Sequence, residues 1–307
     1  MSDDAAALRL IEERLAREIG LDVHSLGPSL IGLAVRARMK RRGAVSAAAY
    51  MPLLDGEAEW QALVEEVVVP ETWFFRDRQP FLALAQWAGR EWLPAHPFGV
   101  MRLLSAPCST GEEPYSIVMA LMEAGVPPER FTVEAVDISE TALAKARRGL
   151  YNRNSFRGSA HDYRESHFAK TAPGWQLAEA VKSQVRFRHV NVLDPSFAHK
   201  ESRFDAIFCR NMLIYFDAPS RTRLMERLHE MLAGDGRLFL GHAEGGIARG
   251  FGFEPLPFSM SFAFRKAAPG TDRPASPQPA AAAKAAVPKR AVPPLVPRFA
   301  SKPAPKP

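Results

Sequence analysis

The stretch from residue 103 to residue 116 holds the residues with the clearest chemical meaning in this 307-residue chain. An apolar run is followed by small residues with one glycine, Gly111, and then by a helical pattern with Pro114 near its start. The next apolar run ends on Asp137, twenty-six residues after Gly111. A carboxylate at the end of a second strand can accept hydrogen bonds from both hydroxyls of a ribose. The pattern therefore predicts a nucleotide-like ligand at the carboxyl edge of a parallel sheet.

The single glycine of this loop argues against a dinucleotide. The G-x-G-x-x-G loop needs three glycines so that the backbone can approach a pyrophosphate, and only Gly111 is present here. A ribose-binding acid without a pyrophosphate cradle favours S-adenosylmethionine over NAD. The alternative interpretation is a plain structural turn.

Four motifs occur in order along the chain: ETWFFRD at 71–77, STGEEPYS at 109–116, FDAIFCRNMLIYF at 204–216 and GHAE at 241–244. Together they resemble the CheR family, which comprises S-adenosylmethionine-dependent methyltransferases of chemoreceptor glutamates. The resemblance extends from about residue 10 to residue 266. It implies methyl transfer to glutamate carboxylates with S-adenosylmethionine as the only cofactor and no metal.

Strand and helix patterns alternate between residues 100 and 266, which predicts an α/β fold with a Rossmann-like doubly wound sheet. The expected strands lie near 101–106, 131–136, 185–190, 204–209 and 236–241, and the expected helices near 114–124, 139–148 and 219–232. Segment 259–264 alternates as a strand and is expected to close the sheet in the antiparallel direction. Residues 151–186 break the pattern, and the resemblance implies a small antiparallel β insertion there. The short connection at 170–175 argues against a binding site for a tethered receptor pentapeptide.

Residues 1–66 are rich in alanine, leucine, glutamate and arginine at helical spacing, which predicts a small all-helical domain before the methyltransferase domain at 67–266. One of its helices, near 29–42, collects basic residues from Arg36 to Arg42 before Gly43. Two interpretations stay open for this basic end. It is either a solvated helix end favoured by the helix dipole or, as the resemblance implies, a docking surface for acidic chemoreceptor helices.

The net charge of +6 is carried by the last part of the chain. Residues 267–307 contain seven lysines and arginines, one acid and eleven prolines, which predicts a disordered tail after a neutral folded region. A neutral folded region argues against nucleic acid as the partner. The apolar runs are too short to span a bilayer, the N-terminus lacks the pattern of a signal peptide, and Cys108 and Cys209 are the only cysteines. A cytoplasmic protein is therefore expected, and we further expect a monomer.

The resemblance assigns roles to residues of the four motifs and of the strand ends. Arg76 and Tyr215 are expected at the reaction centre, where a guanidinium and a phenolic hydroxyl can orient carboxylate oxygens. The predicted cofactor-binding residues are Thr72, Arg76, Glu113, Asp137, Asn191, Val192, Arg210 and Asn211.

Each assignment has a structural alternative. Arg76 could pair with Asp77 on the surface, Tyr215 could serve packing alone, and Asn191 could form an Asx turn. Glu112 is expected to be an ordinary acid in the first turn of its helix. Pro70 stands where relatives often have asparagine, which puts a cofactor contact at that position in doubt.

The expected chemistry needs little acid–base catalysis. A glutamate acceptor is already ionised at neutral pH, so His242 is expected to have a structural role. The motif at 204–216 contains no Asn-Pro-Pro-Tyr sequence, which argues against an amide or base nitrogen as the acceptor. Two other functions stay open: a scaffold that binds S-adenosylmethionine without turnover, and a methyltransferase that acts on nucleic acid.

Overall fold

The computed structural model describes residues 3–26, 30–68, 70–157, 162–197 and 203–268. Most of the predicted tail at 267–307 thus lies outside the described residues. No helix in the described part of the chain is long and apolar enough to cross a bilayer.

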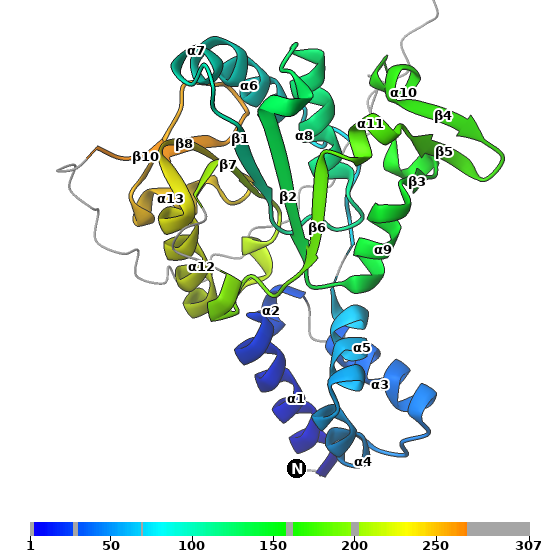
Figure 1. The fold of residues 1–307 in the computed structure, drawn as a ribbon. Coiled ribbons are helices and arrows are strands. Elements are labelled where there is room, and N and C mark those ends of the chain that lie inside the picture. The colour runs from blue at the N-terminus through cyan, green and yellow to red at the C-terminus, as the bar shows by residue number, and fades with distance from the viewer. Residues whose placement is uncertain (1–2, 27–29, 69, 158–161, 198–202, 269–307) are drawn as a thin grey trace, which may run out of the picture.

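Helices alone make up the N-terminal domain, which Figure 1 shows in blue beneath the sheet. The first helix buries Ala7, Ile11, Leu15 and Ile19, which follow one another at a four-residue spacing and so lie on one face. The helices are α1 (Asp3–Ile19), α2 (Val23–Leu26), α3 (Leu30–Arg42), α4 (Ala47–Tyr50) and α5 (Glu57–Val67). A separate apolar core forms among them.

The main sheet has seven strands in the order β6-β2-β1-β7-β8-β10-β9. The strands β6, β2, β1, β7 and β8 run parallel, while β10 is antiparallel to both β8 and β9. Their bounds are β1 (Met101–Ser105), β2 (Phe131–Asp137), β6 (Val185–His189), β7 (Phe204–Cys209), β8 (Leu232–Leu240), β9 (Phe253–Pro255) and β10 (Ala263–Lys266). The predicted doubly wound α/β fold is therefore confirmed.

The antiparallel closing strand begins later than predicted. It runs from Ala263 to Lys266 instead of 259–264, and it is preceded by Met260 at φ 58° and Phe262 at φ 48°. Positive φ is incompatible with extended strand geometry, so the alternating pattern at 259–262 does not form a strand. The direction of the strand agrees with the prediction.

Helices cover both faces of the sheet. The first face carries α6 (Gln79–Trp87) and α8 (Glu112–Glu123), and the second carries α12 (Ala218–Met231). Side chains alternate between the faces, with Leu103 and Phe208 in the first core and Leu104 and Ile207 in the second. Two further short helices are α7 (Leu93–Ala95) and α13 (Gly245–Ala248).

The predicted insertion forms a three-stranded antiparallel sheet in the order β3-β5-β4, at one side of the main sheet in Figure 1. Its elements are β3 (Leu150–Tyr151), α10 (Asp162–His167), β4 (Phe168–Thr171), β5 (Gly174–Leu177) and α11 (Glu179–Lys182), and it follows α9 (Glu140–Arg148). This confirms the small antiparallel insertion.

The order of the strands reverses between β1 and β7, because the chain continues from β1 to β2 on one side and from β7 to β8 on the other. Ligands of doubly wound sheets bind outside the carboxyl ends of the strands at such a switch point. The N-terminal domain lies against this edge in Figure 1.

Backbone hydrogen bonds around Gly20 join the N-terminal domain to this edge. The Asp22 N–H donates to the Tyr215 carbonyl (2.7 Å), and the Asp217 N–H donates to the Gly20 carbonyl (2.9 Å). Gly20 has φ +75°, and a Cβ there would lie 2.6 Å from Leu193 Cδ1. Glycine is therefore required at position 20 by both conformation and space.

We expect Gly20→Ala to destabilise the protein more than Gly43→Ala. Both glycines have positive φ, but a Cβ at Gly43 would meet no atom within 4 Å. Left-handed strain alone costs about 1–2 kcal/mol, and overpacking against Leu193 adds about 1–3 kcal/mol for Gly20→Ala. Urea denaturation of the two variants measures the difference. Equal losses in the free energy of unfolding would show that the contact around Gly20 is loose.

Candidate functional site

Two adjoining cavities lie at the carboxyl edge of the sheet and share Pro107, Ser109 and Asn211 in their walls. Every predicted site residue lines at least one of them. The first cavity is lined by Asp137, Asn191, Val192, Asn211 and Tyr215, and the second by Thr72, Arg76, Glu113, Arg210 and Asn211. The structure thus brings together residues that are up to 143 positions apart in the sequence (from 72 to 215).

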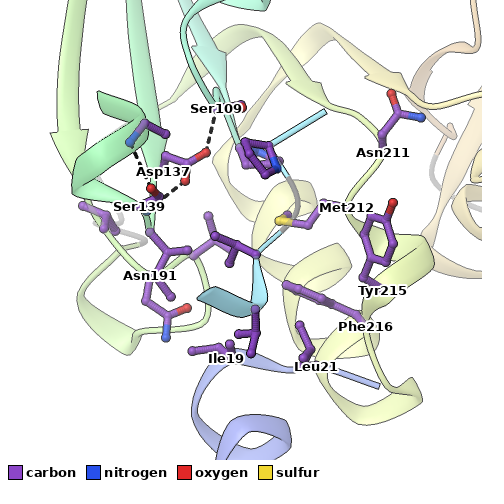
Figure 2. Close-up of a pocket in the computed structure, with 18 residues that line it drawn as sticks. Ile19, Leu21, Ser109, Asp137, Ser139, Asn191, Asn211, Met212, Tyr215 and Phe216 are labelled. Carbon is purple, nitrogen blue, oxygen red and sulfur yellow. Dashed lines mark hydrogen bonds between the residues drawn. The ribbon is translucent and has the colours of Figure 1, made fainter. Parts of the chain in front are cut away.

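Asp137 is held at the end of β2 by backbone groups, as Figure 2 shows. One carboxylate oxygen accepts from the Ser109 N–H (2.7 Å) and the other from the Ser139 N–H (2.9 Å). Burial raises the pKa of Asp137 above its ordinary value, although these N–H groups favour the charged form. Each oxygen keeps a further lone pair, so the carboxylate can accept from two ligand hydroxyls.

The rest of the first cavity is largely apolar. Ile19 and Leu21 of the N-terminal domain and Phe216 form one side of it in Figure 2. The hydroxyl of Tyr215 points towards Asn211 and away from Ile19. An apolar slot with a carboxylate at one side suits a flat base attached to a sugar.

The side chain of Asn191 points away from Asp137, towards the end of α1 (Figure 2). Its amide nitrogen donates to the Glu18 carbonyl (2.7 Å), and its oxygen accepts from the Leu193 N–H (2.9 Å). The second bond is the Asx turn that the sequence left open as an alternative. One N–H and one lone pair of this amide stay available, so the adenine contact stays a prediction.

The second cavity is built around a buried cation, Arg210. Its guanidinium is paired with Asp77 (2.8 Å) and Glu113 (3.2 Å), and its side chain is 1% exposed. Ser105 donates a further hydrogen bond to Glu113 (2.8 Å). Burial raises the pKa of Glu113, while Arg210 acts to lower it.

Arg76 is not paired with Asp77, which instead contacts Arg210. The Arg76 guanidinium lies over the Trp73 ring at 4.4 Å and donates to the Glu71 carbonyl (2.9 Å). Both neighbours of Arg76 have positive φ, 53° at Phe75 and 56° at Asp77. Ser109 and Asn211, in the walls of both cavities, share this strain. Strained backbone of this kind concentrates at functional sites.

The insertion holds the segment that carries Arg76. Phe74 is 1% exposed, and its ring packs against Tyr151 (4.7 Å between centroids) and Phe168 (5.0 Å). The Phe74 N–H donates to the Ser155 carbonyl (2.9 Å). The position of the Arg76 turn therefore depends on the insertion as well as on the main sheet.

Sequence reasoning gave no role to Glu244 or Ser109, and it did not foresee that one nitrogen of Arg210 is left without a partner. Glu244, fully buried, accepts from the N–H groups of Asn211 (2.8 Å) and Gly241 (2.7 Å) and so fixes the loop after β7. Ser109 Oγ and Arg210 Nε are buried and have no hydrogen-bond partner among the described residues. An acid at the end of the motif at 241–244 was the available signal for Glu244, whereas the two unpaired atoms become visible only in three dimensions.

Glu112 differs from the ordinary first-turn acid that was expected. It is 2% exposed, and its carboxylate accepts from the hydroxyls of Thr110 (2.6 Å) and Ser155 (2.8 Å). Burial raises its pKa. The glutamate therefore joins the first loop to the insertion.

The basic end of α3 is largely neutralised by α5. Arg38 forms two hydrogen bonds to Glu59 (2.8 and 3.0 Å), Arg42 lies 3.4 Å from the same carboxylate, and Arg41 is paired with Glu66. Arg36 and Lys40 are exposed and make no ion pair within the described parts of the chain. Of the five cations of the predicted surface, these two are thus the ones without an ion pair inside the described ranges.

The fold and these cavities define a doubly wound α/β protein with a nucleotide-type site at the switch point of its sheet. Residues 70–247 match the family described as "CheR methyltransferase, SAM binding domain". The match covers more than half of the chain, so the protein belongs to the CheR methyltransferase family.

Relatives of known name agree with this family. The chain is 46% identical over 267 residues to "Probable biofilm formation methyltransferase WspC" of Pseudomonas aeruginosa, covering 86% of this chain and 63% of that protein. It is 35% identical over 215 residues to "Chemotaxis protein methyltransferase" of Salmonella typhimurium, covering 67% of this chain and 72% of that protein. The chain thus spans less than two thirds of the length of the WspC relative.

The residues present fit S-adenosylmethionine. Asp137 offers acceptors for ribose hydroxyls next to an apolar slot, and the second cavity offers cations and a carboxylate for an amino-acid group. The unpaired Ser109 Oγ and Arg210 Nε also suit a polar ligand, because buried polar atoms are normally satisfied. No group of three or more histidine, cysteine, aspartate or glutamate side chains in the described ranges could hold a metal.

We expect Arg210→Ala to cost about 3–5 kcal/mol of unfolding free energy near pH 8, because it leaves a carboxylate buried without its cation. The raised pKa of Glu113 means that the folded state binds a proton more readily than the unfolded state. Stability from that proton is present below the ordinary glutamate pKa of about 4.3 and is lost as the pH rises through the folded-state pKa. Because Arg210 acts to lower the pKa of Glu113, its removal raises that pKa further, so the loss for Arg210→Ala should shrink between pH 8 and pH 5.

The matched control is the double variant Arg210→Ala/Glu113→Gln, which leaves a similar cavity without the charge. Denaturation at both pH values compares the two proteins. A pH dependence that survives in the double variant would assign the effect to other groups.

Proposed function

We propose that this protein transfers a methyl group from S-adenosylmethionine to glutamate side chains of a methyl-accepting chemoreceptor, forming glutamate methyl esters. The observation that carries the proposal is the joined pair of cavities, which places Asp137 on one side of Ser109 and Asn211 and places Arg76 and Glu113 on the other. The names of the relatives support methylation in chemosensory signalling.

S-adenosylmethionine supplies, when bound, an electrophilic methyl group on a positively charged sulfur. Asp137 binds the ribose hydroxyls, and Ile19, Leu21 and Phe216 exclude water from the first cavity. Arg76, free of any carboxylate partner among the described residues, orients a carboxylate at the second cavity. Thr72, Val192 and Asn211 line the rest of the proposed cofactor site.

Tyr215 acts on the acceptor in this proposal. Its hydroxyl points towards Asn211, where the two cavities meet (Figure 2). One O–H donor there can orient a glutamate oxygen without removing a proton, because the carboxylate is ionised at neutral pH. The enzyme gains rate mainly by alignment and by removal of water.

The acceptor is proposed to be an acidic receptor helix that docks on the N-terminal domain. Arg36 and Lys40 carry the free positive charge of α3, and Leu33 between them and the start of the helix is 56% exposed. We further propose a monomer that acts in the cytoplasm, without a tethered receptor pentapeptide and without nucleic acid. The two-residue connection between β4 and β5 supports the absence of a tether.

The direct test is transfer of radiolabelled methyl from S-adenosylmethionine to membranes that contain chemoreceptors of the host. Label on receptor bands that is released by mild alkali supports glutamate esters, because methyl amines and ethers resist that treatment. Tight binding of S-adenosylmethionine with no receptor label would favour a scaffold instead. Alkali-stable label would point to a different acceptor atom.

Tyr215→Phe should lower kcat by roughly three- to tenfold, the effect of losing one orienting hydrogen bond. The dissociation constant for S-adenosylmethionine should stay within twofold of the wild-type value, because the ring that lines the cavity is kept. Tyr163→Phe is the matched control, since Tyr163 lies in the insertion and packs against Phe75. Steady-state methylation gives kcat, and calorimetry gives the dissociation constant. An equal kcat for wild type, Tyr215→Phe and Tyr163→Phe would show that Tyr215 has a packing role only.

A further inference from the structure

The helix α5 contacts the loop that follows Asp137. One Glu65 oxygen accepts from the Ser139 hydroxyl (2.5 Å), and the other accepts from the Thr141 N–H (3.2 Å). Gln61, one turn earlier, donates to the Ile138 carbonyl (2.8 Å). Because α5 belongs to the N-terminal domain, these hydrogen bonds connect that domain to the cofactor side of the sheet.

Ser139 connects Glu65 with Asp137. Its N–H donates to the Asp137 carboxylate (2.9 Å), and its hydroxyl oxygen caps α9 by accepting from the Ala142 N–H (3.0 Å). The same hydroxyl gives its proton to Glu65. Ser139 is 5% exposed, and its hydrogen bonds to Asp137 and to Ala142 are buried, while the bond to Glu65 is partly buried.

Glu65 also acts on the start of α9. The first N–H groups of a helix have no partner within the helix, and Glu65 accepts from one of them, that of Thr141. A carboxylate at this end is favoured by the helix dipole. Glu65 thus serves as a second cap of α9 that comes from another domain.

The charge of Glu65 is favourable for the start of α9 but unfavourable for Asp137. Its charge opposes ionisation of Asp137 and contributes to the raised pKa of that carboxyl. A second carboxylate near the ribose-binding acid repels its charge, so we expect a compensating role in holding the neighbouring groups in position. Val67 and Val68, which follow in the same segment, also line the first cavity, so the position of α5 determines part of the wall.

We propose that Glu65 is a positioning residue for cofactor binding: it holds Ser139, and through it the Asp137 carboxylate, in the orientation that receives the ribose. The inference rests on the proposed function, because it takes S-adenosylmethionine as the ligand of the first cavity. It adds that α5 of the N-terminal domain orients the ribose-binding acid, beyond the apolar wall that Ile19 and Leu21 supply.

The test compares Glu65→Ala with Glu57→Ala, a matched change at an exposed position in the first turn of the same helix. Calorimetric titration with S-adenosylmethionine should give a dissociation constant roughly tenfold higher for Glu65→Ala, the effect of about 1.4 kcal/mol. Glu57→Ala should stay within twofold of wild type. An unchanged constant for Glu65→Ala, even with a lower midpoint of thermal unfolding, would overturn the proposal, because the contact would then be structural only.

Two further variants test whether Glu65 acts on Asp137 through Ser139. Glu65→Gln keeps an oxygen for the Ser139 hydroxyl and should recover most of the affinity, which a role of the charge itself would not allow. In a Ser139→Ala background, Glu65→Ala should have little additional effect, since neighbouring groups of one network are not additive. A full tenfold loss in that background would exclude the route through Ser139.

The outcomes also separate this inference from the proposed function. A wild-type protein that does not bind S-adenosylmethionine would overturn both together. Wild-type binding combined with unchanged binding by Glu65→Ala would overturn this inference alone. Asp137→Ala serves as the positive control for lost ribose contacts.

Discussion

The burial of one cation, Arg210, is the constraint on which the geometry of the site depends. A guanidinium that is 1% exposed is tolerated only if carboxylates offset its lost hydration, and Asp77 and Glu113 do so. These two acids come from the turn that carries Arg76 and from the first turn of α8. The ion pairs therefore join three segments that are distant in sequence, and the strained turn around Arg76 has an anchor.

The same principle extends to the other buried acids. Glu112, Glu244 and Asp137 each accept hydrogen bonds from backbone or hydroxyl donors, and each contact ties one loop to another. An unpaired buried carboxylate costs several kcal/mol, so this network forms with the fold and does not wait for a ligand. A site that is organised in advance spends little of its binding energy on ordering loops, which suits a reaction that depends on alignment.

The sequence predicted most of the fold, because apolar runs and their spacing report burial directly. The sheet, its helices and the insertion follow from such local patterns, and every site residue predicted from the motifs and strand ends lines one or both cavities. The missed features depend on long-range partners: Glu59 and Glu66 neutralise the basic end of α3, and the amide of Asn191 bonds to Glu18. The closing strand was misplaced because Met260 and Phe262 have positive φ, which an alternating pattern does not reveal.

The N-terminal domain is attached to the cofactor cavity at two separate places. Around Gly20 its backbone forms hydrogen bonds with Tyr215 and Asp217. Through Glu65 it accepts a hydrogen bond from Ser139, in the loop that follows Asp137. The first contact lies beside Tyr215 and the second beside Asp137, and both of these residues line the first cavity. In the proposed function a receptor helix docks on this domain. It would therefore contact a part of the protein that is hydrogen-bonded both near Tyr215 and near Asp137. If the proposed acceptor docks there, acceptor docking and cofactor binding should be thermodynamically coupled, since the same domain contacts both sites, and coupling of this kind is reciprocal.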